Sequence, residues 1–563
     1  MKGFFVFLGM SLLGSWCVAQ SSEDVFVPAT TIRHANEKKG TMHTNYEVFK
    51  GKWTHGHEPS PMALMHGPAQ SSTVQGYWPS DIRAAYRLNS AGGSGAIAIV
   101  DAFDLPTNLH DFNTFSSTFG LPTETSTNRT ASSNTVFQVI YQGGTVPSSK
   151  GTDANQWGGE ISLDMEWAHA IAPGAKIYLI ECQSDDLTDL LAGVAIANGL
   201  SGVHEISMSF GGGEDPSELQ LDSTFTTANK VYFSATGDSS GSTSYPATSP
   251  NVISVGGTSL DLSASDAVIS EVGWNGESNG PSQDEPRPGF QSSVESVVGA
   301  MRGTPDVAAD ADPDTGCAVY NSNGISGASA DPDTTAWYVF GGTSLACPIC
   351  AGLTNLRGLF AASSQQELNR QYNQFAGTSY LRDITSGSSS GYSAMVGYDL
   401  VTGLGAPTGM YETANYRPSS ISIINGTVVE GTIGSLAAID GHDYVIRSVQ
   451  ASANTQEATV AGTFAGSLPS GTTLAVSLAV TAYDGSASCT ISAYNPTTNA
   501  WVVVAVPTFG PNNTSQTITL ANPAQFFGAT GSMQFKIDAV QTGTTAFRLG
   551  LDYITLSTIG AQT

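Results

Sequence analysis

Two acidic residues stand four positions apart in WGGEISLDMEWAHAIAPGAKIYLIEC, residues 157–182. On a helix that turns 100° per residue, Glu160 and Asp164 lie in the middle of one apolar face. That face carries Leu163, Trp167, Ala168 and Ile171, and the opposite, polar stripe carries Ser162, Glu166 and His169. A buried charge costs several kcal/mol unless it is paired or neutralised. The pattern therefore indicates that no helix forms here, that a helix lines a wet cleft, or that the two residues are an acid/base pair.

A possible nucleophile stands in YVFGGTSLACPICAGL, residues 338–353. The two glycines predict a turn that delivers Ser344 to the start of an apolar helix, with Pro348 in the first turn. The amino end of a helix stabilises a developing anion, so a serine there could act as a nucleophile. A serine that only caps the helix is the common alternative.

Serine attacks a carbonyl only when a base accepts its proton. Five of the nine histidines (His34, His43, His55, His57 and His66) stand near the amino terminus, and His442 stands in a region rich in strands. His169 is expected on the polar stripe, and neither His110 nor His204 has the His-Gly-Thr context of a histidine-dependent subtilase. We therefore interpret Glu160 as the base and Asp164 as the group that orients it.

A third acid, Asp238, follows the apolar run of VYFSATGDSSG, residues 231–241. A carboxylate would repel a developing oxyanion, whereas a protonated carboxylic acid would donate a hydrogen bond to it. Asp238 can fill that role only at acid pH. An aspartate that forms an ordinary turn is the alternative.

Apolar runs that alternate with helical stretches must position these residues. We expect strands over 95–104, 175–182, 204–211, 230–238 and 251–259, and helices over 104–120 and 185–198. This alternation predicts an α/β fold with a doubly wound, mostly parallel sheet, whose site lies beyond the carboxyl ends of the strands. After about residue 415 only short strands and turns are expected, which favours an all-β sandwich or jelly roll.

The composition limits the classes of partner that this protein is expected to bind. The 563 residues carry a net charge of −27, which disfavours nucleic acid and anionic membranes as partners. Residues 1–19 have the pattern of a secretory signal peptide, with an apolar run too short to span a bilayer, so we expect a secreted, extracellular protein. Of the five cysteines that would remain, Cys347 and Cys350 form a CxxC motif without a second metal-ligand pair, which favours apolar packing.

Taken together, the GGTSLACP motif, the Glu-x-x-x-Asp helix and the Gly-Asp-Ser turn resemble the sedolisin family of serine-carboxyl peptidases, which have a subtilisin-like fold. The resemblance implies Ser344 as nucleophile, Glu160 as base, Asp164 as its partner and Asp238 as oxyanion donor. It also implies that Asp101 supports the glutamate from a second layer, and that Ser209, Phe210 and Gly211 line the substrate cleft.

The same resemblance implies a Ca²⁺ site in LRDITSG (381–387) and AMVGYDLVTGLGAPTG (394–409). Its ligands would be the carboxylates of Asp383 and Asp399 and the backbone carbonyls of Ile384, Met395 and Gly397. Oxygen ligands of mixed type are what Ca²⁺ prefers. The family usually has glycine where Met395 stands, and a backbone carbonyl tolerates that exchange.

The sequence thus predicts a signal peptide (1–19), a short leader or linker (20–76), a peptidase domain (77–414) and a β-sandwich domain (415–563). The family usually has a long folded propeptide, and this leader is short beside it. The expected activity is that of a secreted acid endopeptidase acting on proteins or peptides. The alternatives are a histidine-dependent subtilase, or an inactive scaffold whose β domain binds a polysaccharide or another surface ligand.

Overall fold

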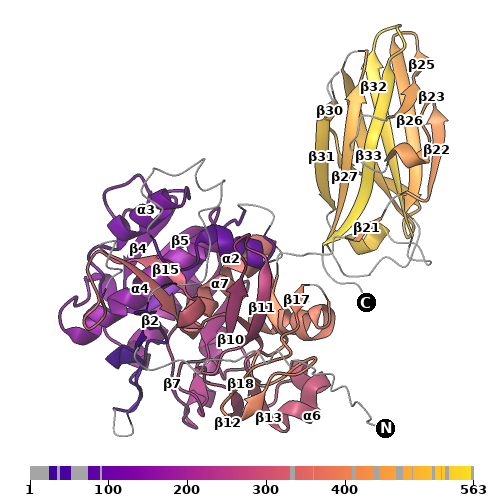
Figure 1. Cartoon of the computed structure of the whole chain (residues 1–563). Helices are drawn as coiled ribbons and strands as arrows, with labels where there is room; N and C mark the ends of the chain where they lie inside the picture. The colour runs from indigo at the N-terminus through magenta and orange to yellow at the C-terminus, as the bar shows by residue number, and fades with distance from the viewer. Residues whose placement is uncertain are drawn as a thin grey trace, which may run out of the picture. The chain divides into compact units, whose positions relative to one another are not determined.

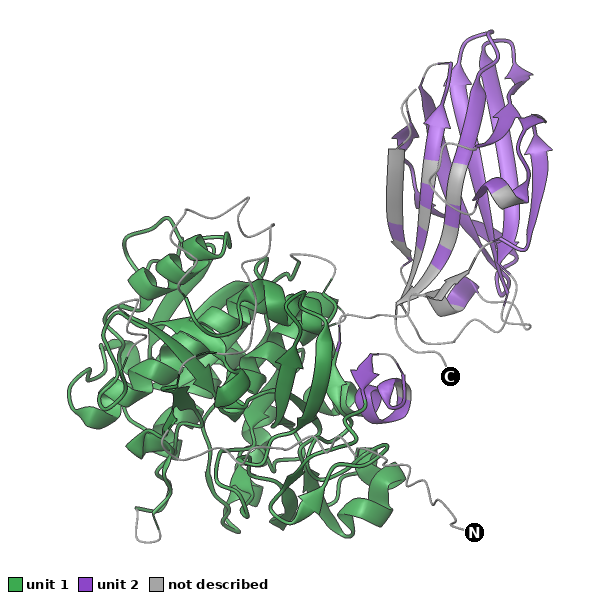
Figure 2. Cartoon of the chain, in the orientation of Figure 1, with its two compact units in different colours: residues 1–368, 383–407 green, residues 369–382, 408–563 purple. Residues whose placement is uncertain are grey.

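The computed structural model describes residues 24–34, 38–51, 53, 74–88, 92–329, 336–358, 360–378, 380–408, 414–416, 418–436, 443–464, 473–484, 486–509, 514–520, 523–526 and 532–559. The chain forms two compact units, residues 1–368 with 383–407 and residues 369–382 with 408–563 (Figure 2). The predicted signal peptide lies outside the described residues, and the predicted domain boundaries stay predictions. Among the described residues, no helix combines the length and the apolar character needed to cross a bilayer.

Unit 1 is built on a sheet of eight strands (Figure 1). Its order is β11 (Val268–Gly273), β10 (Ile253–Leu262), β8 (Val231–Ala235), β6 (Val203–Met208), β3 (Ala96–Ala102), β5 (Lys176–Cys182) and β4 (Phe137–Tyr141), with β14 (Val307–Asp310) also paired to β10. Strands β4, β5, β3, β6, β8 and β10 run parallel, and β11 is antiparallel to β10. The subtilisin-like, doubly wound sheet predicted from the alternating pattern is therefore present.

Helices cover both faces of this sheet because alternate strand residues point to opposite sides. In β3, Ile97 and Ile99 pack with α4 (Thr152–Ile171), whereas Ala98 and Val100 pack with α5 (Leu187–Gly199). Helix α7 (Thr343–Arg357) packs against α4 and so lies on the same face. Asp101 continues the series of Ile97 and Ile99, which places it on the α4 face.

Further elements of unit 1 surround this core. The remaining helices are α2 (Pro79–Ala85), α3 (Asn108–Thr118), α6 (Glu295–Val298) and α8 (Ser364–Arg370), which runs into unit 2. The small strand pairs are β7 (Gly212–Gly213) with β9 (Ser244–Tyr245), β12 (Gly280–Pro286) with β13 (Met301–Thr304), and β18 (Ser388–Ser389) with β19 (Tyr392–Ser393).

A four-stranded sheet draws part of the predicted leader into unit 1. Its order is β1 (Val25–Phe26), β2 (Glu47–Phe49), β16 (Trp337–Gly341) and β15 (Cys317–Tyr320). The sequence analysis expected only an extended leader or linker here. Tyr46 and Val48 are fully buried and pack this segment onto the rest of unit 1.

Unit 2 contains two antiparallel sheets over one apolar core, as the strand-rich pattern predicts. One sheet has β23 (Thr427–Glu430), β24 (Tyr444–Arg447), β33 (Arg548–Ile559), β27 (Thr473–Ala482) and β31 (Thr514–Leu520), with β21 (Ala414–Tyr416) on β33. The other has β22 (Ser420–Asn425), β26 (Thr455–Phe464), β32 (Met533–Thr542), β28 (Ala487–Asn495) and β29 (Ala500–Ala505), with β25 (Val449–Ser452) on β26 and β30 (Thr508–Phe509) on β28. Phe464, Ile491 and Phe535 are among the buried residues between them, which makes the unit a β-sandwich.

Candidate active site

Ser344 is the second residue of α7 and is fully buried in unit 1. The turn before it needs glycine, because Gly342 has a φ of +101° and a side chain there would collide with the Asn45 carbonyl oxygen and with Asp238 Oδ2. The Ser344 hydroxyl donates to the Ser209 carbonyl oxygen at 3.1 Å, and one backbone N–H, that of Asn45, donates at 3.2 Å both to Ser344 Oγ and to Glu160 Oε2. The serine therefore lies next to the base that the sequence predicts for it.

Pro348 lies inside α7, so the expectation that it falls in the first turn is wrong. A proline has no backbone N–H, and the Ser344 carbonyl loses the donor that an unbroken helix would supply from this position. The Ser209 hydroxyl donates to that carbonyl at 3.4 Å. The Ser344 carbonyl, which lacks a helical donor because of the proline, is thus linked to Ser209, directly after β6.

Glu160 and Asp164 are both fully buried, one turn apart on α4. Asp164 Oδ1 accepts from the Ser209 hydroxyl at 2.9 Å, and Glu160 Oε2 accepts from the Asn45 backbone N–H at 3.2 Å. Burial raises the pKa of each carboxyl well above its ordinary value, and the nearby Asp101 raises both further. Both carboxyls therefore hold a proton to higher pH than a free carboxyl does.

Asp101, which the resemblance implies as a supporting residue, lies near this pair. It lies near the end of β3, and neither of its buried carboxyl oxygens has a hydrogen-bond partner among the described residues. Burial raises the pKa of Asp101 to about 8. A carboxyl without donors holds its proton more firmly in such surroundings, and its charge, when it does ionise, raises the pKa of Glu160 and Asp164.

Asp238 follows β8 and meets the first residue of α7. Its Oδ1 accepts from the Thr343 N–H at 2.9 Å and from the Thr343 hydroxyl at 2.7 Å, whereas the buried Oδ2 has no partner among the described residues. Burial, followed by the charge of Glu47, raises the pKa of Asp238 well above its ordinary value. A protonated Oδ2 would face the side of Gly342 where the Asn45 carbonyl oxygen lies.

Residues 209–211, the predicted cleft strand, follow β6 and differ in their contacts. The backbone of Gly211 exchanges two hydrogen bonds with His43, at 2.9 and 3.2 Å, and the Ser209 carbonyl accepts from the Asn45 side chain at 2.7 Å. Phe210 is fully buried in the apolar core with Trp157, so its side chain does not line the cleft. Because side chains alternate along a strand, Phe210 points away from the groove that its neighbours border.

The histidines described in unit 1 do not touch the nucleophile. Ser344 hydrogen-bonds Asn45 and Ser209, and none of its partners among the described residues is a histidine. His204 stacks on Phe360 with ring centroids 3.7 Å apart, and His110 is exposed. The geometry therefore favours the carboxyl base over a histidine base.

The polar stripe expected on α4 faces protein instead of water. Glu166 accepts from the Tyr320 N–H at 2.9 Å, Ser162 from Asn321 at 3.1 Å, and His169 lies 2.9 Å from the Pro122 carbonyl. Burial lowers the pKa of His169 to about 4. The stripe is fully buried because helix α3 and strand β15 pack over it.

The two loops expected to hold Ca²⁺ come together in unit 1. Gly397 N donates to Asp383 Oδ2 at 3.0 Å, and Met395 N donates to Asp399 Oδ2 at 2.9 Å. The Thr402 hydroxyl lies 3.5 Å from the Ile384 carbonyl, which joins the second loop to the first. No group of three or more His, Cys, Asp or Glu side chains suited to a metal occurs among the described residues.

All five cysteines of the described part of the chain are buried free thiols. Cys347 and Cys350 lie within α7, and burial raises the pKa of Cys347 to about 12. A thiol of that kind is neutral and unreactive at ordinary pH. The CxxC motif therefore packs inside a helix, as expected.

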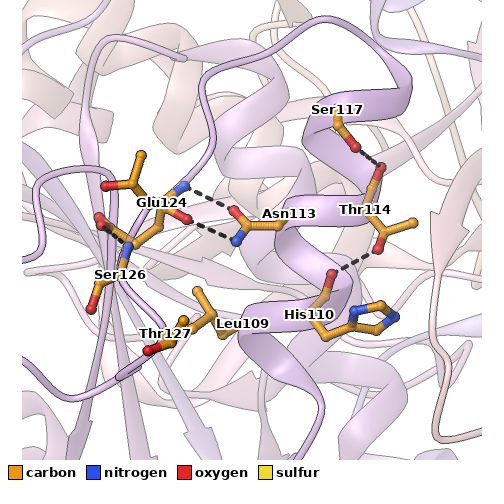
Figure 3. A pocket seen from close by; sticks show the side chains of 9 residues that line it. Leu109, His110, Asn113, Thr114, Ser117, Glu124, Ser126 and Thr127 are labelled. Atoms are coloured by element: carbon orange, nitrogen blue, oxygen red, sulfur yellow. Dashed lines mark hydrogen bonds between the residues drawn. The ribbon is translucent and has the colours of Figure 1, made fainter. Parts of the chain in front are cut away.

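A surface pocket of about 430 Å³ lies away from these residues (Figure 3). Helix α3 and residues 124–127 line it, and Asn113 spans it with two hydrogen bonds to the Glu124 backbone, at 2.8 and 2.9 Å. None of the candidate catalytic residues lines this pocket. Its polar groups are largely satisfied within the protein, so it carries no assignment.

Sequence reasoning missed Asn45, whose backbone and side chain both enter the site. The signal in the sequence was the alternation of Tyr46 and Val48 with Glu47 and Phe49, which is typical of a half-buried strand. The pattern predicts a strand but not its partner. That partner, β16, lies almost 300 positions further along the chain.

Comparisons with known proteins identify relatives of this chain. Residues 150–357 match the Subtilase family. Kumamolisin from Bacillus sp. (strain MN-32) is 31% identical over 399 residues, which are 62% of this chain and 66% of kumamolisin. Sedolisin from Pseudomonas sp. (strain 101) is 28% identical over 389 residues, which are 60% of each chain. The chain thus spans less than two thirds of either relative's length.

A solved structure is also similar. It is Pseudomonas sedolisin, a serine-carboxyl proteinase, complexed with two molecules of pseudo-iodotyrostatin. Its sequence is 26% identical, and the match has a TM-score of 0.47 over 60% of this chain and 96% of that one.

The raised carboxyl pKa values predict how stability depends on pH. Burial raises the pKa of Asp101 to about 8, and likewise that of Glu205, whereas carboxyls of an unfolded chain titrate near pH 4. Between these values the folded state binds more protons than the unfolded state. The free energy of unfolding should therefore fall as the pH rises from about 4 to 8.

Thermal denaturation across this range measures the effect. We expect a lower Tm at pH 8 than at pH 4, and a shallower decline in Asp101→Asn, which has no proton to lose. A Tm that stays level or rises toward pH 8 would contradict the assignment of protonated buried carboxyls.

Proposed function

We propose that this chain, which is related to the sedolisin family and has a subtilisin-like fold, is an exported serine-carboxyl endopeptidase active at acid pH. The observation that carries the proposal is the meeting of four groups from different elements. Ser344 of α7 contacts Glu160 of α4, and the end of β8 holds Asp238 against the start of α7, next to the Ser344 backbone N–H. Ser209, after β6, contacts both Asp164 and Ser344. Export rests on the amino-terminal sequence pattern.

In this proposal Glu160 is the general base. It accepts the Ser344 hydroxyl proton while the serine oxygen attacks the carbonyl carbon of the substrate, and it then gives the proton to the departing amine. Water hydrolyses the resulting ester by the reverse proton path. The shared Asn45 N–H, which donates at 3.2 Å both to Glu160 Oε2 and to Ser344 Oγ, places the two side chains next to each other and supports this assignment.

Asp238 and the Ser344 N–H would stabilise the tetrahedral intermediate. The N–H already donates to a carbonyl oxygen, that of Asn45, at 2.9 Å. Asp238 Oδ2 is buried without a partner, and in its protonated form it can donate to an oxyanion at the same place. The protonated form is required because an ionised Asp238 would repel that charge, and burial favours this form by raising the pKa of Asp238.

Asp164 and Asp101 tune the base without reaching the substrate. Asp164 is a positioning residue, because its hydrogen bond to the Ser209 hydroxyl fixes the strand end that accepts from Ser344. Asp101 has no hydrogen bond among the described residues, and its effect on Glu160 is electrostatic.

The two loops expected to bind Ca²⁺ provide the type of ligand atom that this ion prefers. The carboxylates of Asp383 and Asp399 and the carbonyls of Ile384, Met395 and Gly397 form an all-oxygen set, and hydrogen bonds already join the two loops that carry it. These five residues would hold the ion, which would supply positive charge to a strongly acidic chain. The function of unit 2 as a binder of polysaccharide or another surface ligand stays a prediction from its strand pattern.

Substitution of the nucleophile and the base tests the proposed function. Ser344→Ala should abolish hydrolysis of a peptide substrate at about pH 3–5, and Glu160→Gln should reduce kcat by roughly 10²–10⁴-fold, because a general base contributes about that much. Glu166→Gln is the matched control, since it changes a buried glutamate of the same helix that contacts Tyr320 instead of the site.

Circular dichroism should show that all three variants fold. Normal turnover by Ser344→Ala or Glu160→Gln would exclude the mechanism. An equal loss in Glu166→Gln would mean that the effect of Glu160→Gln comes from altered packing of α4.

Calcium binding can be tested through stability, without an activity readout. If the loops bind Ca²⁺ in the folded state only, the Tm should rise with Ca²⁺ concentration and fall after chelation. Mg²⁺ is the matched control, because it demands a smaller octahedral shell and should raise the Tm much less. Asp383→Asn should remove most of the Ca²⁺ dependence, and a Tm indifferent to Ca²⁺ in the parent chain would contradict the site.

A further inference from the structure

Asp238 lies between a buried strand and an exposed turn. Strand β8 ends at Ala235, and Ser240 and Gly241 are exposed to solvent. The Thr343 N–H and hydroxyl both donate to Asp238 Oδ1, so they fix one oxygen of the carboxyl. The direction of the other oxygen, Oδ2, also depends on the backbone on either side of Asp238, because the side chain turns with the peptide groups that carry it.

Ser278 holds the backbone on both sides of Asp238. Its N–H donates to the Gly237 carbonyl oxygen at 2.6 Å. Its hydroxyl oxygen accepts from the Ser239 N–H at 3.1 Å, and the hydroxyl donates to the Ser239 carbonyl oxygen at 2.9 Å. One residue thus hydrogen-bonds both chain neighbours of the proposed oxyanion donor.

The close approach of Ser278 requires glycine at position 237. Gly237 has a φ of +106°, and a Cβ there would lie 3.0 Å from the Ser278 hydroxyl oxygen. A backbone of this conformation favours glycine. The Gly237 N–H also donates to the Thr343 hydroxyl oxygen at 3.0 Å. The start of α7 and Ser278 therefore hold the backbone before Asp238 from two sides.

The segment that carries Ser278 is itself anchored. Ser278 and Glu277 are both fully buried. Glu277 Oε2 accepts from the Gly257 N–H of β10 at 2.6 Å, and the Ser389 hydroxyl of β18 donates to the Glu277 carbonyl oxygen at 2.9 Å. The large sheet and the β18–β19 pair therefore fix this segment, which can serve as a rigid support for the backbone around Asp238.

The direction of Asp238 Oδ2 matters for the proposed chemistry. This oxygen lies beside Gly342, and so does the Asn45 carbonyl oxygen that accepts from the Ser344 N–H. The two donors of the proposed oxyanion hole therefore converge on one place only while Oδ2 keeps its direction. A misplacement of about 1 Å in an active site can cost roughly 10²-fold in rate.

We propose that Ser278 is a positioning residue for peptide hydrolysis, which fixes the peptide groups on both sides of Asp238 and thereby aims Oδ2 at the tetrahedral oxygen of the intermediate. Ser278 acts through Asp238 and is not itself a catalytic residue. The inference rests on the proposed function, since it requires Asp238 to donate to the oxyanion. A serine that only stabilised the loop would not favour the transition state over the bound substrate.

Kinetics of peptide hydrolysis at about pH 4 test this role. Ser278→Ala removes both hydroxyl bonds to Ser239 and should lower kcat about tenfold with KM within about twofold, because the oxyanion forms only after the substrate binds. Ser278→Thr keeps a hydroxyl and should recover most of the parent kcat. Ser364→Ala is the matched control, because its buried hydroxyl accepts from the Tyr232 N–H at 2.9 Å, near the start of β8.

Inhibition by a peptide aldehyde separates lost oxyanion stabilisation from a general change of the cleft. The Ser344 oxygen adds to the aldehyde carbon, the serine proton passes to Glu160, and the aldehyde oxygen becomes a tetrahedral oxygen that Asp238 can meet. The corresponding peptide alcohol binds without this step. We expect Ser278→Ala to weaken inhibition by the aldehyde about tenfold and to leave inhibition by the alcohol unchanged.

Circular dichroism reports whether each variant folds. If Ser278→Ala does not fold, Ser278→Cys takes its place, because a thiol keeps the size of the side chain but is a weak donor and acceptor. The positioning role would be overturned, while the proposed function stands, by a folded variant with the parent's kcat and aldehyde inhibition, by equal losses for aldehyde and alcohol, or by an equal loss of kcat in Ser364→Ala. No hydrolysis by the folded parent chain at any pH would overturn the proposed function and this inference with it.

Discussion

Burial of carboxyl groups in one cleft is the constraint on which the rest of this structure depends. Glu160, Asp164, Asp101 and a carboxyl oxygen of Asp238 are withdrawn from water, and they receive few donors among the described residues. Several ionised carboxylates at such a place would repel one another and lose their hydration. Some of these carboxyl groups must therefore stay protonated. In the proposed mechanism this condition would let one acid donate to an oxyanion while another accepts a proton.

The same cleft explains why the amino-terminal segment matters. The Asn45 side chain donates to the Ser209 carbonyl, and the Asn45 backbone N–H donates to Glu160 and to Ser344. This segment therefore lies directly against the proposed base and nucleophile.

Much of this arrangement could be predicted from local patterns. Apolar runs located β3, β5, β6, β8 and β10, and the carboxylates within an apolar helix face marked Glu160 and Asp164. Long-range packing could not be predicted in the same way. The stripe of Ser162, Glu166 and His169 reads as solvent-facing until α3 and β15 cover it. The approach of Asn45 to Ser344 depends on a strand register set almost 300 residues away, which the local alternation around Tyr46 does not encode.

The central claim is that burial keeps a carboxyl of this cleft protonated where a free one is ionised. Infrared spectroscopy of the folded chain at about pH 6, well above the ordinary pKa of an aspartic acid, measures this directly through the carbonyl band of a protonated carboxylic acid. The account predicts that the band is present and loses intensity in Asp101→Asn, whose parent residue has a pKa raised to about 8 by burial. Absence of the band at that pH, or a band of equal intensity in the folded variant, would contradict it.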